Sequence, residues 1–296
     1  KILSTTPIFM KLVSQKKISL NHKVKQFLPQ FNGPLKDEVT VKHLLTHSSG
    51  IIPYHEYFLE NPIKSKKEII KDIIQKDLDY KPGSDTKYSD LGIILLGEII
   101  EKVQDFNLKE LSEKYVFKPF NMHNTEYNPK KVQFDNIVPT ENDIRFRKKI
   151  IHGVVHDENA FILGGVSPHA GVFSTAENIG NYIQMLLNGG TWLGKRYFKK
   201  SIIEEFTTKQ QLPLKTDRAI GFDTPSQNGK SSAGDYFSNN SFGHLGFTGT
   251  SVWADKENQI IIVLLTNRVY PSREKKGIYK ARRKIYNSIM RELIAD

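Results

Sequence analysis

The chain has 296 residues, of which 38% are hydrophobic and 25% charged, proportions that are typical of folded globular proteins and exclude a disordered or fibrous chain. Lys and Arg outnumber Asp and Glu by 43 to 32, but this excess of +11 is scattered rather than interleaved with aromatic residues, so we expect no nucleic-acid partner. The lack of Cys excludes disulfides and thiolate chemistry, and no apolar run reaches the ~20 residues that a membrane helix needs, so we expect no membrane span.

The first third of the chain predicts three helices. The apolar segment Ile2–Val13 predicts a buried helix in which Pro7 should cause a kink. Thr40 is a typical N-cap for a short helix over Val41–Leu45, and Lys66–Gln75 has apolar residues at helical spacing.

The middle of the chain predicts helices separated by a long irregular stretch. Pro82–Asp85 predicts a turn, followed by a strongly apolar helix over about Leu91–Val103. Asn128–Ala170 lacks periodicity and is rich in Asn, Asp, His and Gly, so we expect surface loops there. Ser174–Glu177 should cap a helix that ends at about Leu187.

Two strands and a helix are expected near the end of the chain. Gly246–Ala254 and Gln259–Asn267 predict strands joined by a turn at Asp255–Asn258, and the continuous apolar run Ile260–Leu265 is typical of a buried strand. Apolar residues then recur at helical spacing, and the basic stretch Lys275–Arg283 is expected to form the solvated face of that helix.

Four short stretches carry the chemistry of this sequence. They are HLLTHSSGI at His43–Ile51, YSDLG at Tyr88–Gly92, HAGVFSTAENI at His169–Ile179 and HLGFTGTSVW at His244–Trp253. In this order and at these separations, the sequence resembles the penicillin-recognising serine hydrolases, a family that includes class C β-lactamases, DD-peptidases and related esterases and aminopeptidases. The resemblance extends over the whole chain.

The resemblance implies a fold of the α/β (α+β) class, of the β-lactamase/transpeptidase type. It has an antiparallel sheet flanked by helices, a mostly helical lobe, and the active site in the cleft between them. We expect one domain over residues 1–296, with the helical lobe at roughly residues 40–210. In the family, two strands precede the nucleophile helix, so part of the sheet is expected to be missing from this chain, which then resembles a fragment.

The family also implies a nucleophilic Ser at the start of a buried helix and a Lys one turn later. The turn KKISL at Lys16–Leu20 resembles the turn that ends this helix in the family, which places the motif Lys at Lys1. The nucleophile would then lie three residues upstream of Lys1. Three S-x-x-K matches inside the chain do not open an apolar helix: Ser14/Lys17, Ser84/Lys87 and Ser272/Lys275.

Two further motifs supply the remaining expected site residues. Tyr88 matches the proton-transferring Tyr of the family's Y-x-N motif, and Asp90 replaces its Asn, so contacts from an amide donor are lost. The H-L-G sequence beginning at His244 takes the place of K-T-G. We expect Gly246 to let a substrate approach the strand closely and Phe247 N–H to be the second oxyanion donor. Because a His is mostly uncharged at pH 7, His244 should bind a substrate carboxylate less well than the motif Lys does.

The other histidines are expected to be structural. His47 and Ser49 lie in a turn resembling one that orders the helical lobe in the family. His152 and His156 have i,i+4 spacing but lie in a loop-like context without a third ligand at zincin spacing, so we expect no metal and no cofactor.

A narrower resemblance concerns the setting of the protein. HGVVHDENAFILGG, from His152 to Gly165, and LLTNRVYPSRE, from Leu264 to Glu274, resemble the β-lactamase-type modules attached to family 3 glycoside hydrolases. This implies a linked upstream glycosidase domain and an exported protein, periplasmic or outer-membrane associated. The sequence therefore predicts a serine hydrolase that acts through an acyl-enzyme on an ester, amide or peptide bond. Its substrate is expected to be a small molecule or a peptide, and its setting cell-wall turnover. A non-catalytic module that binds cell-wall peptides is the alternative, and a true β-lactamase is less favoured.

Overall fold

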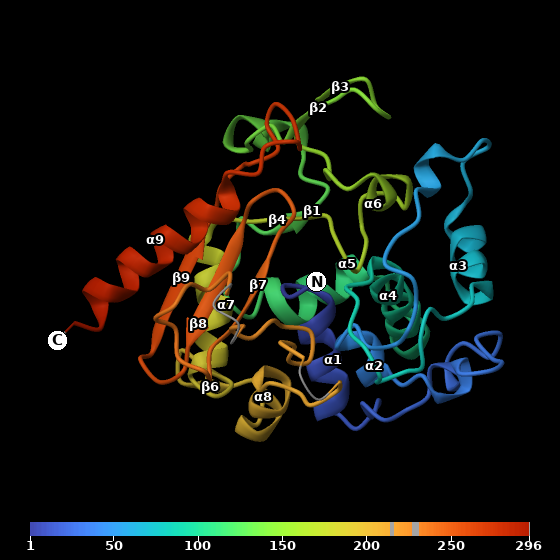
Figure 1. The fold of residues 1–296 in the computed structure, drawn as a ribbon, viewed down its shortest axis with the longest axis horizontal. Helices are drawn as coiled ribbons and strands as arrows, with labels where there is room; N and C mark the ends of the chain where they lie inside the picture. Colours follow the sequence, from blue (N-terminus) through green and yellow to red (C-terminus); the bar gives the residue numbers. More distant parts are fainter. Residues whose placement is uncertain (214–215, 227–230, 296) are drawn as a thin grey trace.

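Helix α1 (Thr5–Ser14) runs through the middle of the molecule, with a β-sheet on one side and a group of helices on the other (Figure 1). The structure is a computed structural model and describes residues 1–213, 216–226 and 231–295. Ile8, Phe9 and Leu12 of α1 have no exposed surface, and they belong to one apolar core with side chains from the sheet and from the helices. This apolar helix is therefore the element on which both sides pack.

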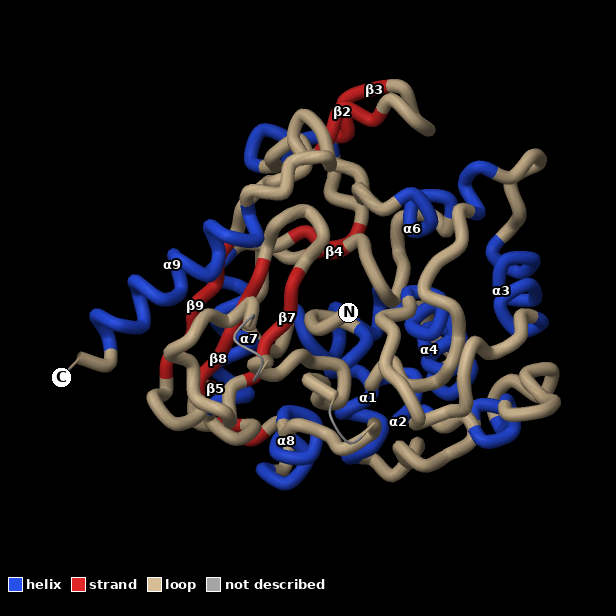
Figure 2. Tube along the Cα trace, viewed as in Figure 1, coloured by secondary structure: helices blue, strands red, loops and turns tan. Residues whose placement is uncertain are grey.

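The sheet consists of three antiparallel strands in the order β7 (Phe242–Leu245), β8 (Ser251–Asp255) and β9 (Ile260–Leu264) (Figure 2). The outer edge of β7 is bridged to Asp223, because Asp223 and Gly243 each donate their N–H to the other's carbonyl oxygen. The antiparallel sheet of the expected fold is thus present. The additional strands expected in this sheet stay a prediction.

Helices cover both faces of the sheet, which explains the unbroken apolar run in β9. Helix α7 (Ala176–Leu187) packs against β8 and β9 on one face. On the other face, Tyr286 and Met290 of α9 (Ile278–Leu293) join Trp253 in a second apolar cluster. A strand that is covered on both faces favours apolar side chains at every position rather than at alternate ones.

The opposite side of the molecule is built from helices that begin at polar N-caps. The Thr40 side chain accepts a hydrogen bond from His43 N–H, and the Ser89 side chain accepts one from Gly92 N–H. The three helices predicted in this part of the chain are confirmed to within one residue at each end. The three predicted helices are α2 (Val41–Leu45), α3 (Lys66–Gln75) and α4 (Asp90–Gln104), and α5 (Leu108–Ser112), which was not predicted, follows them.

The remaining helices and strands are short and lie at the periphery. Three antiparallel pairs are formed by β1 (Glu126–Tyr127) with β4 (Val172–Phe173), β2 (Glu141–Asp143) with β3 (Lys149–Ile151), and β5 (Thr191–Trp192) with β6 (Lys195–Arg196). Two further helices are α6 (Glu158–Ile162) and α8 (Lys200–Thr207). The region 128–170 is mostly loop, as predicted, apart from a 3-10 helix, the β2–β3 hairpin and α6.

The strand predicted over Gly246–Ala254 is confirmed for Ser251–Ala254, which belong to β8, but its predicted start is wrong, because residues 246–250 form the turn between β7 and β8. The preceding strand β7 lies outside the prediction. It contains Gly243, which ordinarily weakens a strand, but here the Trp253 ring packs so closely that an added Cβ would lie 2.6 Å from a ring carbon. Glycine is therefore needed at this position for packing.

Two predictions about helix starts also need correction. Pro7 causes no kink, because α1 begins at Thr5 and Pro7 lies in the first turn, where its missing N–H has no partner to lose. The N-cap of α7 is Thr175 rather than Ser174. Although α7 falls within the range 40–210 expected for the helical lobe, it packs on the sheet.

Within the described residues, no helix has the length and apolar character to cross a membrane.

Candidate active site

Lys1 is separated from α1 by the turn at residues 2–4 and lies between the sheet and the helices of the opposite side (Figure 1). Its Nζ is 2.9 Å from His47 Nε2 and 5.0 Å from the centre of the Tyr88 ring. Burial lowers the pKa of the Lys1 side chain to about 7, although the carboxylates of Asp223 and Asp90 favour the charged form. An uncharged Lys1 amine is therefore accessible near neutral pH.

His47 follows α2 and is fixed by its backbone and by its ring. It has a left-handed φ of 56°, and its carbonyl oxygen accepts hydrogen bonds from the Tyr80 hydroxyl and from Lys87 N–H. Its ring Nδ1 accepts a hydrogen bond of 3.1 Å from Ser89 N–H, and the ring stacks on Tyr88 with centroids 4.1 Å apart. Burial, with the nearby charge of Lys1, lowers the pKa of His47 well below its ordinary value, so the ring is uncharged.

Tyr88 stands directly before the N-cap of α4 and faces both sides of the site. Its ring centre lies 6.1 Å from that of His244 and 5.5 Å from the guanidinium carbon of Arg218, which forms an ion pair with Asp223. Although 38% of the residue is exposed, burial of the hydroxyl and the charge of Asp90 raise its pKa. At neutral pH Tyr88 is therefore a protonated phenol.

His244 lies in β7 with its ring buried, and the residue is 9% exposed. Its Nδ1 is 2.7 Å from the carbonyl oxygen of Leu245, which can only accept, so Nδ1 carries the proton. Nε2 is then a bare acceptor, and it has no hydrogen-bond partner among the described residues. Burial and the charge of Lys1 lower the pKa of His244 to about 3, so the ring is uncharged at pH 7.

Asp90 is the first residue of α4 and lies on the Lys1 side of the site. Burial raises the pKa of its carboxyl, against the opposing charges of His169 and Lys1. His169 is held by its neighbours, since its Nε2 is 3.0 Å from Asp157 and its Nδ1 is 2.9 Å from Ser167 Oγ. The position of the family's Asn is thus filled by an acidic group near a partly buried His–Asp pair.

Gly246 and Phe247 begin the turn that follows β7. Gly246 N–H donates to the Thr250 carbonyl oxygen over 2.8 Å, and a Cβ on Gly246 would overlap Thr250 Oγ1. This packing requires glycine independently of any substrate. Within the described chain, no group accepts a hydrogen bond from Phe247 N–H, while the Phe247 side chain is 60% exposed.

Two arginines hold this turn from outside. Arg268 Nε donates to the Phe247 carbonyl oxygen over 2.7 Å, and its guanidinium lies 4.4 Å from the centre of the Phe247 ring. Arg282 donates to the carbonyl oxygen of Gly249 over 3.1 Å and is only 3% exposed. Arg282 belongs to the basic stretch Lys275–Arg283, so the expectation that this stretch is simply a solvated face is wrong at this residue.

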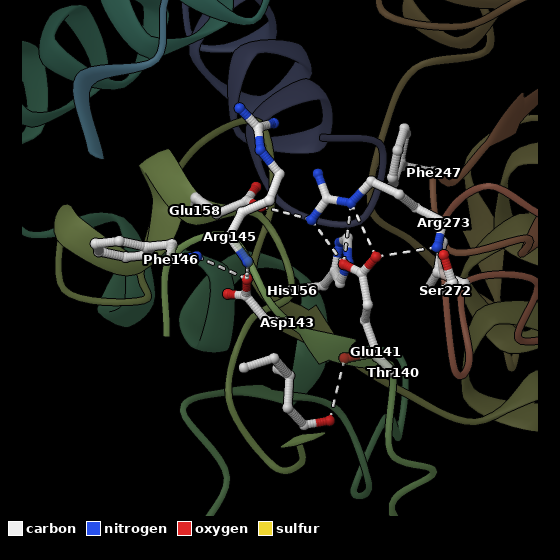
Figure 3. A network of polar contacts seen from close by, with 12 residues as sticks. Thr140, Glu141, Asp143, Arg145, Phe146, His156, Glu158, Phe247, Ser272 and Arg273 are labelled. Carbon is white, nitrogen blue, oxygen red and sulfur yellow. Dashed lines mark hydrogen bonds and ion pairs between the residues drawn. The ribbon is translucent and has the colours of Figure 1, made fainter. Parts of the chain in front are cut away.

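A larger polar network lies beside the turn and joins distant parts of the chain (Figure 3). Arg273 reaches both oxygens of Glu141, with a shortest separation of 2.6 Å, and also lies 2.5 Å from Glu158. His156 Nε2 is 2.7 Å from Glu141, and the His156 ring stacks on Phe247 at 5.7 Å. The network, which we call the Arg273 clamp, thus fastens the segment after β9 to the loops around β2 and α6.

The histidines considered for a metal are engaged elsewhere. His156 contacts Glu141 as described, and His152 Nε2 is 2.7 Å from the Ile137 carbonyl oxygen. Among the residues with described positions, no group of three or more His, Asp or Glu side chains is arranged to bind a metal ion.

The alternative S-x-x-K pairs do not place a lysine amine beside Tyr88, although Ser84 lines the neighbouring cleft. Their lysines are all exposed, and Lys87 is paired with Asp79 at 3.3 Å. Ser84 Oγ donates to the Lys81 carbonyl oxygen over 2.7 Å. Lys17 and Lys275, the lysines of the two remaining pairs, are exposed as well. Of the four motif lysines, Lys1 is the one that lies against Tyr88.

A cleft of about 870 Å³ opens beside these residues. Arg218, Asp223 and Leu245 line it at the sheet, and the turn with Asp85 and Thr86 lines the opposite wall. The cleft borders the site, because Leu245 follows His244 in β7 and the Arg218 guanidinium carbon lies 5.5 Å from the Tyr88 ring centre.

Comparison with known proteins places the chain in a family. The sequence model of the family described as Beta-lactamase matches residues 1–286. The chain is 33% identical over 300 residues to N-acetylmuramyl-L-alanine amidase of Bacillus subtilis (strain 168), covering 90% of this chain and 66% of that protein. It is 31% identical over 296 residues to a Salmonella agona (strain SL483) protein named "Putative D-alanyl-D-alanine carboxypeptidase", covering 90% and 67% respectively. The chain belongs to the β-lactamase family.

The fold agrees with this assignment. A penicillin-binding protein homologue from Caulobacter crescentus superimposes with a TM-score of 0.72, at 18% identity, over 97% of this chain and 81% of the other. The chain spans about two thirds of the length of the two curated relatives. None of the three proteins compared here is named as a glycosidase, and the attachment to a glycoside hydrolase stays a prediction.

The structure brings together residues from motifs that are far apart in sequence. Lys1, Tyr88 and His244 converge, and Asp90 lies close enough to affect the charge of Lys1. Sequence reasoning treated His47 as structural and did not select Arg218 or Asp223. The H-S-S-G motif could have marked His47 as a site residue, whereas no local sequence pattern marks Arg218 or Asp223.

Proposed function

We propose that this protein is a serine hydrolase that acts through an acyl-enzyme on an ester, amide or peptide bond. The observation that carries the proposal is the position of Lys1 Nζ, 2.9 Å from His47 and 5.0 Å from the Tyr88 ring centre. In the proposal Lys1 is the Lys of an S-x-x-K motif, and the nucleophilic Ser lies three residues upstream. Residues 2–4 form a turn between Lys1 and α1, which begins at Thr5, so the proposal requires the chain before Lys1 to bring the Ser beside the same amine.

The ionisation states suggest how the proton is moved. The uncharged Lys1 amine accepts the proton of the Ser hydroxyl as its oxygen bonds to the substrate carbonyl carbon. The phenol of Tyr88 protonates the leaving group and recovers a proton from Lys1. The oxyanion accepts hydrogen bonds from the Ser N–H and from Phe247 N–H, which has no protein partner among the described residues. Water then attacks the acyl-enzyme, with the same groups moving its proton.

The substrate is proposed to be a cell-wall peptide or a related small molecule. The names of the two curated relatives, an amidase of N-acetylmuramyl-L-alanine and a carboxypeptidase of D-alanyl-D-alanine, support this class. We further propose that the protein is exported and acts in cell-wall turnover, since such substrates lie outside the cytoplasm.

Covalent labelling tests the proposed function. We expect a chain extended upstream through at least three residues before Lys1 to form a stoichiometric adduct with a fluorophosphonate probe, detected by intact mass. The chain beginning at Lys1 lacks the proposed nucleophile and should give none. An adduct on Ser14, Ser84 or Ser272 would contradict the placement of the motif. An absence of any adduct on the extended chain would favour a non-catalytic peptide-binding module.

We expect poor hydrolysis of penicillins and cephalosporins, because His244 is uncharged where the family motif has Lys. Arg218 cannot easily substitute, since it is paired with Asp223. Replacing a charge-assisted contact of roughly 1.5–3 kcal/mol with a neutral one near 1 kcal/mol implies about a tenfold loss in carboxylate recognition. We therefore expect His244→Lys to raise kcat/KM for nitrocefin about tenfold relative to p-nitrophenyl butyrate. A wild type already efficient on nitrocefin, with no gain in the variant, would refute this role of His244.

A further inference from the structure

The hydrogen bonds of His47 define which of its ring nitrogens carries the proton. Ser89 N–H can only donate, so His47 Nδ1 must be an unprotonated acceptor. The uncharged ring then carries its single proton on Nε2, which lies 2.9 Å from Lys1 Nζ. An N–H donor at that distance needs a lone pair opposite, and the Lys1 amine has one only when it is uncharged.

We propose that His47 is a positioning residue that holds Lys1 as an uncharged amine by donating its Nε2–H to the Lys1 nitrogen. This inference rests on the proposed function, in which Lys1 accepts the proton of the nucleophile. A charged Lys1 would direct an N–H at the Nε2–H of His47. Relief of that clash would require the opposite tautomer, which would in turn place an N–H against Ser89 N–H.

The surrounding structure prevents His47 from turning away. Its ring is 4.1 Å from that of Tyr88, and its backbone oxygen is held by Tyr80 and Lys87. Ser89, the donor to Nδ1, is itself fixed as the N-cap of α4. The residue is 1% exposed, so water does not compete for Nε2. His47 therefore keeps one orientation and one tautomer.

The other groups around Lys1 act on its charge from a distance and do not form a hydrogen bond with its amine. Asp223 and Asp90 stabilise a charged Lys1, whereas Arg218 opposes it. His244 is uncharged with its proton on Nδ1, and Tyr88 is a protonated phenol. Of these neighbours, His47 is the one within hydrogen-bond distance of Nζ.

Two matched variants separate the two hydrogen bonds of His47. In His47→Gln the side-chain amide nitrogen can take the place of Nε2 and donate to Lys1, while the acceptor for Ser89 is lost. In His47→Asn the side-chain oxygen can take the place of Nδ1, while the donor to Lys1 is lost. The assay is the pH dependence of fluorophosphonate acylation by the chain extended upstream of Lys1.

We expect His47→Asn to shift the acidic limb of the pH–rate profile to higher pH by about one pH unit. With a wild-type limb near pH 7, acylation at pH 7 falls about fivefold and returns to within about threefold of wild type at pH 10. His47→Gln should leave the limb in place. Loss of rate at every pH in both variants, with the limb unmoved, would show that His47 only maintains structure and would overturn the proposal.

A second measurement does not depend on activity. The ¹⁵N NMR signals of the His47 ring in the wild type, assigned by their loss in His47→Gln, report the tautomer directly. We expect a protonated Nε2 and an unprotonated Nδ1 that do not change between pH 6 and pH 9. A ring protonated on Nδ1, or one that titrates in this range, would overturn the proposal whatever the activities of the two variants. An inactive wild type with the expected tautomer would instead count against the proposed function.

Discussion

Tyr88→Phe is expected to slow acylation by roughly 10²–10⁴-fold, the range associated with a positioned acid or base. Only a hydroxyl is removed from Tyr88. The ring contacts with His47 and Lys1 remain. The measurement is the acylation rate constant in single-turnover p-nitrophenyl ester cleavage, with the upstream-extended chain.

Tyr279→Phe is the matched control for the loss of a hydroxyl. Tyr279 lies in α9 and is 59% exposed, so the same chemical change there should leave the rate unaltered. The urea unfolding midpoint of Tyr88→Phe should also equal that of the wild type. An unchanged acylation rate in Tyr88→Phe would assign Tyr88 a purely structural place at the start of α4.

Arg273→Ala should lower the free energy of unfolding by about 3 kcal/mol, at the lower end of the range for breaking a buried pair. The substitution leaves the carboxylates of Glu141 and Glu158 without their shared cation, and these side chains are 6% and 3% exposed. Urea denaturation at pH 7 measures the change. Arg145→Ala removes an ion pair with Glu56 whose partners are both more than 40% exposed, so it should have little effect.

The effect of Arg273→Ala should depend on pH in a defined direction. Burial would raise the pKa of Glu141, but hydrogen bonds from Arg273 and His156 outweigh it and lower the pKa below the ordinary 4.5. A carboxyl with a lowered pKa stabilises the folded state fully above its unfolded pKa and loses that contribution as the pH falls. The difference in stability between wild type and Arg273→Ala should therefore shrink below about pH 4.5. A difference that stays constant between pH 7 and pH 3 would refute an electrostatic role for the clamp.

The parts of the fold set by local chemistry could be predicted from the sequence. Helices α2 and α3 were predicted because Thr40 provides an N-cap and because apolar residues recur at helical spacing in Lys66–Gln75. Strand β7 was missed, because Gly243 is explained by its close contacts with Val252 and Trp253 on the neighbouring strand. Those contacts are not visible in a local pattern.

The candidate site shows the same division. Lys1, Tyr88 and His244 could be selected because motif spacing marks them, and the structure places them together. The role inferred for His47 could not be predicted from the sequence, since it depends on which ring nitrogen faces Ser89 and which faces Lys1. The Arg273 clamp was also invisible, because Arg273 and Glu141 are 132 positions apart.

That separation has a consequence for how the chain acquires its structure. During synthesis the β2–β3 hairpin and α6 leave the ribosome more than 100 residues before Arg273 does. Until then Glu141 and Glu158 have no arginine to share, and the loops around them cannot settle into their final positions. Contacts between distant residues form late, because closing a long loop costs entropy before the contact repays it. The Arg273 clamp and the loops around β2 and α6 should therefore be among the last regions of the protein to become protected from hydrogen exchange, after α1 and the helices around it.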